Sequence, residues 1–337
     1  MRKPIFVAIL LLGVFFVMTR MAEVEEIVLT SQRGDWRFLL LALTAVFAWL
    51  FNVAISYKTI FQATGIEEKF TKLILLAAAA NFVNVVAPSV GIGGMAVFIT
   101  EARRRGYSTG RVTMAGVLYV LFDYAGFLCV LFLGLIVLIR RQNLNPAEVA
   151  ATTLLLLISA SIAAFVYLSM RSSQMLRKVM VWIARRINRL LWPFYHRPYL
   201  SEERAYGFAQ DAAAGLLELR RNPQNLITPF GLALSNKTLL ISILFFVFMA
   251  FKTPLSIGTL VAGFSVSYLS LIISPTPSGI GVVEGIMTLV LRSMYVPWGL
   301  AALITLTYRG FTFWLPLIFG LVAFRYISHG AEAEKAT

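Results

Sequence analysis

The sequence predicts an all-α polytopic membrane protein with about six to seven spanning helices and two opposed re-entrant hairpins, related as an inverted repeat. Of its 337 residues, 59% are hydrophobic and only 14% are charged. The mean hydropathy of +0.79 lies far outside the soluble globular range. Apolar runs of membrane length recur along the chain. Two further runs are interrupted by proline and glycine at corresponding places in two halves, which is typical of transporter binding sites.

The clearest interruption is segment 274–285, with the sequence SPTPSGIGVVEG, between the apolar runs 255–273 and 286–296. Its prolines and glycines cannot continue a membrane helix. Unpaired backbone at membrane depth is tolerated only where protein covers it or a wet cavity receives it. Glu284 follows at once, and an ionisable group in such a place indicates function. We therefore predict that this segment forms one wall of a polar cavity.

A partial repeat of this motif lies at 88–94, with the sequence PSVGIGG, and is followed by Glu101. Apart from one skipped residue, its PS-GIG pattern matches residues 277–281. The alternative interpretation is that both segments are unrelated kinks that only help helices to pack.

The spanning helices are expected to begin with an uncleaved N-terminal helix. Its apolar run follows three residues that include Arg2 and Lys3, and no small-residue cleavage site comes after it, so the N-terminus is predicted to be cytoplasmic. In order, the predicted spans are residues 4–19, 37–60, 112–139, 149–170, 225–251 and 298–326.

Charge placement orients the two hairpins. The first, 73–102, runs directly into Arg103, Arg104 and Arg105, which should be cytoplasmic, so both of its ends are expected on that side. A kinked full span, which would place the arginines outside, is the alternative. The second hairpin, 255–296, then enters from the opposite face. We divide the chain into a membrane half (1–170), a basic segment (171–223) and a second membrane half (224–330).

The basic segment has ten arginines and lysines against four acidic residues. Between 175 and 192, apolar residues recur at helical spacing, which predicts an amphipathic helix at the membrane surface. A solvated cytoplasmic helix is the alternative. Six arginines are predicted to face lipid headgroups: Arg103, Arg104, Arg105, Arg185, Arg186 and Arg189.

Five charged residues lie in or at the ends of apolar segments: Glu101, Asp123, Glu284, Arg292 and Arg309. Because a lone charge at mid-bilayer costs at least about 2.5–3.5 kcal/mol, each should pair or face water. The pairs to test are Glu284 with Arg309 and Asp123 with Arg309. A structural ion pair is the alternative to a ligand role for each. Helix N-termini after Pro88 and Ser278, together with Arg309, could hold a phosphate or a carboxylate.

Enzyme chemistry is poorly supported. Cys129 is the single cysteine and there are two histidines, so we expect no metal site and no cofactor. Ser278 has no histidine near it in sequence, and nothing fixes the geometry of Asp123 and Glu284 for acid–base work. The net charge of +14 is accounted for mainly by positive-inside topology, and no basic domain suggests nucleic-acid binding.

The segment 275–284 resembles the P-x-P-G-G-hydrophobic-G-x-x-E signature of the lysylphosphatidylglycerol synthase/flippase transmembrane family. Residues 84–94 resemble the family's earlier Asn…Pro…Gly-Gly element, and Asp123 and Arg309 match an Asp and an Arg of later helices. The similarity covers about residues 5–330. Ser278 departs from the pattern, because glycine is usual there.

The resemblance implies a lipid-translocating membrane region without the family's cytosolic acyltransferase-like domain, since the chain ends at Thr337. We therefore expect a non-enzymatic flippase or scramblase that moves an anionic or aminoacylated phospholipid across the cytoplasmic (inner) membrane, with both termini cytoplasmic. Membrane phospholipids are the expected partners, and a homodimer is left open. A non-catalytic partner subunit of a lipid- or glycan-modifying enzyme is the alternative. The candidate substrate-binding residues are Asn81, Asn84, Pro88, Ser89, Gly91, Gly93, Gly94, Glu101, Asp123, Pro275, Pro277, Ser278, Gly279, Gly281, Glu284 and Arg309.

Overall fold

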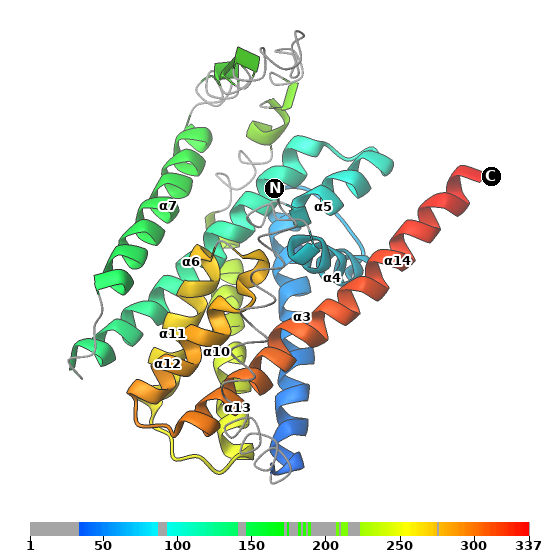
Figure 1. The fold of residues 1–337 in the computed structure, drawn as a ribbon. Helices are drawn as coiled ribbons and strands as arrows, with labels where there is room; N and C mark the ends of the chain where they lie inside the picture. The colour runs from blue at the N-terminus through cyan, green and yellow to red at the C-terminus, as the bar shows by residue number, and fades with distance from the viewer. Residues whose placement is uncertain are drawn as a thin grey trace.

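The computed structural model describes residues 34–86, 93–140, 146–171, 223–274 and 276–336, with a few short groups between 174 and 214. In this part of the chain, all regular secondary structure is helical (Figure 1). The predicted first helix, 4–19, lies outside the described residues.

Within the described residues, five stretches are long and apolar enough to cross a membrane, and they contain or overlap the five predicted spans after the first. Three are single helices: α3 (Trp36–Ala63), α6 (Thr109–Arg140) and α7 (Pro146–Arg171). The fourth begins in the 3-10 turn η1 (Pro223–Leu226) and continues through α10 (Ile227–Ala250). The fifth is continuous through α13 (Trp298–Arg309), a π-helical turn η3 (Gly310–Trp314) and α14 (Leu315–Ala336). The prediction of a polytopic, all-helical membrane protein is therefore confirmed.

Two pairs of shorter helices occupy the predicted hairpin regions. The first helical pair is α4 (Phe70–Val86) and α5 (Gly93–Arg104). The second helical pair is α11 (Ile257–Ile273) and α12 (Val282–Ser293), joined through the short 3-10 turn η2 (Pro277–Gly279). The two helices of each pair contact one another, and α4 also contacts η2. At 17 residues each, α4 and α11 are about 26 Å long, too short to span comfortably.

The open ends of the two pairs lie at opposite ends of α6. Helix α5 ends at Arg104, and α6 begins five residues later at Thr109. At the other end of α6, Leu138 packs in an apolar cluster with Ala262 of α11 and Met294 beyond α12. The second pair therefore opens near the last turn of α6, and the first pair near its first turn (Figure 1).

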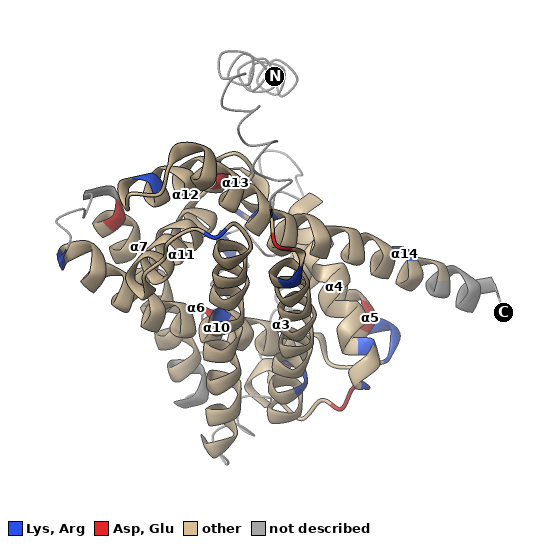
Figure 2. Ribbon diagram, turned by 90° about the horizontal axis from the view of Figure 1, so that it is seen from below, with Lys and Arg blue, Asp and Glu red and all other residues tan. Residues whose placement is uncertain are grey.

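Charged residues are concentrated at helix ends and loops, and most of the helical surface carries none (Figure 2). Asp123 of α6 and Lys237 of α10 are exceptions, because both lie well inside spanning helices, where they pair with each other. Large apolar side chains are exposed along α3, α7 and α14, including Phe51, Leu157 and Val322. Such a surface suits contact with lipid rather than water.

Part of the predicted basic segment packs against the bundle. Ala212 and Ala213 are buried in an apolar cluster with Val112 and Ala115 of α6. A Cβ added to Gly110 would lie 2.6 Å from the backbone oxygen of Phe208, so only glycine permits this approach. Most of 175–192 lies outside the described residues, but Arg185, Arg186 and Arg189 are described there and exposed.

Candidate functional site

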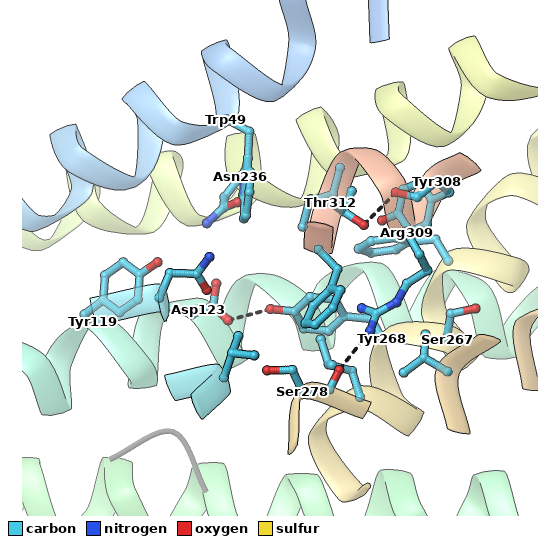
Figure 3. Close-up of a pocket in the computed structure, with 17 residues that line it drawn as sticks. Trp49, Tyr119, Asp123, Asn236, Ser267, Tyr268, Ser278, Tyr308, Arg309 and Thr312 are labelled. Atoms are coloured by element: carbon cyan, nitrogen blue, oxygen red, sulfur yellow. Dashed lines mark hydrogen bonds between the residues drawn. The ribbon is translucent and has the colours of Figure 1, made fainter. Parts of the chain in front are cut away.

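A cavity of about 270 Å³ lies where the two helical pairs meet the spanning helices (Figure 3). Its lining mixes polar and apolar side chains, and we call it the polar cavity because charged residues lie in its wall. Its lining comes from α3, α4, α6, α10, α11, α12, α13, η2 and η3. The polar and aromatic lining residues include Trp49, Asn81, Tyr119, Asp123, Asn236, Ser267, Tyr268, Ser278, Tyr308, Arg309 and Thr312.

The turn at residues 277–281 forms one wall through an unusual backbone path. Ser278, Gly279 and Gly281 have φ angles of 49°, 71° and 81°, in the left-handed region that favours glycine. Ser278 is the exception to that preference, and its side chain lines the cavity (Figure 3). Pro277 begins η2, and Gly279, which ends it, is buried. A strained non-glycine residue at a cavity wall is typical of functional sites.

Glu284 and Arg309 form the first of the two predicted ion pairs. Glu284 Oε1 accepts a hydrogen bond from Arg309 Nε at 2.7 Å, and its Oε2 accepts one from the Gly281 backbone N–H at 2.7 Å. Arg309 also donates from Nη2 to the Ser278 carbonyl oxygen at 3.0 Å. We expected the N-terminus of α12 and the Arg309 guanidinium to hold a ligand anion. Instead, both donate hydrogen bonds to the carboxylate of Glu284.

The second predicted pair, Asp123 with Arg309, is wrong: Asp123 pairs with Lys237. Lys237 Nζ lies 2.6 Å from Asp123 Oδ1 and 2.6 Å from the Tyr268 hydroxyl oxygen. The Tyr268 hydroxyl in turn donates to Asp123 Oδ2 at 3.0 Å, and Lys237 Nζ lies 4.1 Å from the Tyr268 ring centroid. Lys237 is fully buried, so a carboxylate close to it is required. Two helices that contact each other, α6 and α10, supply the pair.

The first helical pair contributes asparagines. Asn81 lines the polar cavity, and Asn84 Oδ1 accepts a hydrogen bond from the Gly94 backbone N–H at 2.6 Å. A Cβ at Gly94 would lie 2.7 Å from Asn84 Nδ2 and 2.8 Å from the Ala80 carbonyl oxygen, so glycine permits α5 to approach α4. Gly93 is the first residue of α5. Pro88, Ser89, Gly91 and Pro275 lie outside the described residues.

Glu101 belongs to an ion network at the open end of the first pair, outside the linings of the two cavities described here. It is buried and pairs with Lys72 and with Arg105, whose Nε lies 3.0 Å from its Oε1. Arg105 also pairs with Glu68 at 2.9 Å. Burial by itself would raise the pKa of Glu101, but the hydrogen bonds and charges of Lys72 and Arg105 hold it below its ordinary value. This network connects the first turn of α4 to the last turn of α5. Arg103 and Arg104 stay exposed.

A larger apolar groove of about 580 Å³ adjoins the polar cavity. It lies between α3, α4 and α14, and it shares Trp49, Asn81 and Tyr119 with the cavity. Asn84 lines it as well. Several of its residues, including Phe51, Val322 and Tyr326, are exposed at the surface of the bundle. A small space with a partly polar lining thus lies beside a larger apolar groove whose lining reaches the outer surface.

Sequence reasoning missed several residues of this site. Lys237 carried a usable signal, because it is a charged residue well inside an apolar run, as Asp123 is. Trp49, Tyr119, Asn236 and Tyr268 carried no comparable signal, because uncharged polar and aromatic residues are common throughout the spans. The π-helical turn that directly follows Arg309 is a further mark of a functional region.

The fold and site define a polytopic helical membrane protein with an internal polar cavity at interrupted helices. The chain belongs to the family described as the lysylphosphatidylglycerol synthase TM region, whose model matches residues 5–320. The family resemblance inferred from segments 84–94 and 275–284 is thus confirmed. Membership places the chain among membrane proteins related to lipid modification or transport. A comparison with curated proteins finds no match.

Proposed function

We propose that this chain is a non-enzymatic lipid transporter, a flippase or scramblase, that moves a phospholipid across the cytoplasmic membrane. One observation carries the proposal: the polar cavity and the apolar groove share Trp49, Asn81 and Tyr119. A membrane lipid has the same two-part character. Its headgroup would occupy the polar cavity while an acyl chain stays in the groove or the bilayer, so neither part is transferred into an unfavourable surrounding.

The two helical pairs would act as opposed re-entrant hairpins of an inverted repeat. Their open ends lie at opposite ends of α6, and the tip region η2 of the second pair contacts α4 of the first. In transporters built this way, the binding site lies where the two repeats meet near the bilayer centre. Both termini are proposed to be cytoplasmic, with the arginines 103–105 on that side.

Alternating exposure of the cavity would require the second pair to separate from α13, because Arg309 bridges Ser278 and Glu284. These contacts are candidates for the interactions that hold one state closed. Movement would be passive or coupled to an ion gradient, with Asp123 or Glu284 as the proton carrier.

The test is transbilayer movement of fluorescent phospholipids in vesicles that contain the purified chain. Wild type should move lipid, and Glu284→Gln and Arg309→Ala should change the rate by about tenfold or more, because each breaks a partly buried ion pair. Arg292→Ala is the matched control, since Arg292 is exposed and stacks only on the Trp298 ring in the contacts described. Folded wild-type protein that moves no lipid would contradict the proposal and favour the partner-subunit alternative.

A further inference from the structure

The apolar groove has about the length of one lipid leaflet. Its α3 lining runs from Phe47, in the middle of that helix, to Tyr57, near the helix end at Ala63. Ten residues of α-helix rise about 15 Å, which is half of a hydrocarbon core of about 30 Å. Helix α4 packs against both α3 and α14 and forms the floor between them (Figure 1). The walls meet at one end, which we call the inner end, where the Phe47 and Phe319 ring centroids lie 5.6 Å apart. The groove therefore matches one acyl chain of a lipid in a single leaflet.

At the opposite, outer end of the groove, a lysine lies against an aromatic ring. Lys58 directly follows Tyr57 on α3, and its Nζ lies 5.8 Å from the centroid of the Phe70 ring in the first turn of α4. Phe51 lines the groove, is 49% exposed and stacks on the same ring, with centroids 6.3 Å apart. Phe70 thus connects the ammonium to the exposed rim of the groove. A lysine near the end of a membrane helix extends its charged head toward the headgroup layer.

The Lys58 ammonium has no acidic partner within the described residues. By contrast, Lys72 and Arg105 at the same end of the bundle are both bound to Glu101. An aromatic ring attracts an ammonium, but the three N–H groups of Lys58 stay available to an anionic oxygen. The outer end of the groove therefore combines an apolar slot with an unpaired positive charge, which complements an anionic lipid.

We infer that the groove is an entry site for an anionic phospholipid, with Lys58 binding the lipid phosphate and one acyl chain lying in the groove. A leaflet lipid has this arrangement, because its phosphate lies in the headgroup layer and its chains reach the bilayer centre. A zwitterionic lipid brings its own cation next to the phosphate, so it gains less from Lys58 than a lipid with net negative charge does.

The inference rests on the proposed lipid-transport function and adds a first binding position to it. The outer end lies on the same side as the arginines 103–105, because Lys72 in the first turn of α4 pairs with Glu101 in the last turn of α5. With these arginines cytoplasmic, as proposed, the groove receives lipid from the cytoplasmic leaflet. The headgroup would then move along the groove to Asn81, which lines both the groove and the polar cavity.

The test is photo-crosslinking of lipid to the purified full chain in phosphatidylcholine nanodiscs. The probes are phosphatidylglycerol and phosphatidylcholine, each with a photoreactive group near the end of one acyl chain and each added in trace amount. Mass spectrometry measures labelling of residues 74–84, the groove floor, relative to residues 154–158 of α7, whose exposed leucines report bulk lipid. In wild type, this relative labelling should be about fivefold higher with phosphatidylglycerol, which corresponds to about 1 kcal/mol for one basic residue at the membrane surface.

Three variants test the role of the lysine. Lys58→Gln removes the charge and should bring the labelling ratio between the two probes to within about twofold. Lys58→Arg keeps a cation that can lie on the Phe70 ring, so it should keep the preference for phosphatidylglycerol. Lys69→Gln is the matched control, because Lys69 is exposed at the same end and makes the same charge change, whereas the cation on the Phe70 ring is Lys58. Its ratio should stay at the wild-type value.

The outcomes separate this inference from the proposed function. Equal labelling of the groove floor by both probes in wild type would overturn the inference, and this comparison needs no variant. Equal losses in Lys58→Gln and Lys69→Gln would also overturn it, because general surface charge would then attract the lipid. In either case, lipid movement in vesicles would still support a lipid transporter. Preferential labelling that depends on Lys58, without movement of any lipid, would support the inference and contradict transport.

Discussion

Removing Lys237, the buried partner of the cavity residue Asp123, should be the most damaging single change at this site. Its ammonium is fully buried and lies 2.6 Å from Asp123 Oδ1. With an effective dielectric constant of about 20, the Coulomb attraction at that distance is about 6 kcal/mol. The desolvation of two ions offsets most of that attraction, so the intact pair adds little net stability. Lys237→Met removes the cation but leaves the carboxylate, and breaking a buried pair in this way costs about 3–5 kcal/mol.

A double-mutant cycle tests this reasoning. Asp123→Asn alone leaves Lys237 uncompensated and should cost a similar amount, whereas Lys237→Met combined with Asp123→Asn should cost less than either single change. The free energy of unfolding would be measured by denaturant titration in detergent micelles. Lys252→Met is the control, because Lys252 is exposed, and it should change stability by less than about 0.5 kcal/mol. The account would be refuted if Lys237→Met lowered the free energy of unfolding by less than about 1 kcal/mol. It would also be refuted if the loss in the double variant equalled the sum of the losses in the two single variants.

Three further predictions concern the hairpin regions and are measured as unfolding free energies in micelles. Gly281→Ala should destabilise the protein by about 1–2 kcal/mol, because φ is 81° at this position. Gly285 lies inside α12 and has equally open space around it, so Gly285→Ala should stabilise the protein by about 0.5–1 kcal/mol. Equal effects of the two substitutions would contradict the backbone argument. Gly94→Ala should cost about 1–3 kcal/mol, because its Cβ would overlap Asn84 and α4 backbone, and an unchanged stability would show that α5 can move away. The pKa of Glu101 is lowered in the folded state, so its ionised carboxylate stabilises the fold at pH values above the unfolded pKa of about 4.5. This stabilisation is lost as the pH falls through the folded pKa. Glu101→Gln should therefore lose less stability than wild type between pH 5 and 3, and an equal loss in both proteins would contradict this assignment.

The spans and their order were predictable because the bilayer sets a minimum apolar length. Residues 37–60 and 112–139 are apolar windows of at least membrane length, and α3 and α6 contain them. The Glu284–Arg309 pair was predictable for a related reason, since a charge within an apolar run must find a partner. The left-handed turn at 278–281 likewise follows from the glycines and the preceding proline.

The partner of Asp123 was not predicted, because choosing it requires knowing which helices touch. Lys237 lies 114 residues away from Asp123 in sequence, and only the packing of α10 against α6 brings the two together. Glu101 was expected to face the cavity, but it ends a helix beside three arginines, and local pairing with Lys72 and Arg105 holds it at the open end of the first pair. Trp49 and Asn236 could not have been singled out, because uncharged polar and aromatic residues are common throughout the spans and only the packing of the helices places these two at the cavity.

The most direct test of the central claim blocks the apolar groove without touching the charged pairs. Ala77 lines the groove, and Ala77→Phe would fill part of it; Ala150→Phe, on the exposed surface of α7, is the matched control. Transbilayer movement of fluorescent phosphatidylglycerol would be measured in vesicles that contain equal amounts of each folded protein. If the groove carries an acyl chain, Ala77→Phe should slow movement by about tenfold or more, while Ala150→Phe matches wild type. Equal rates for all three proteins would contradict a lipid path through this groove.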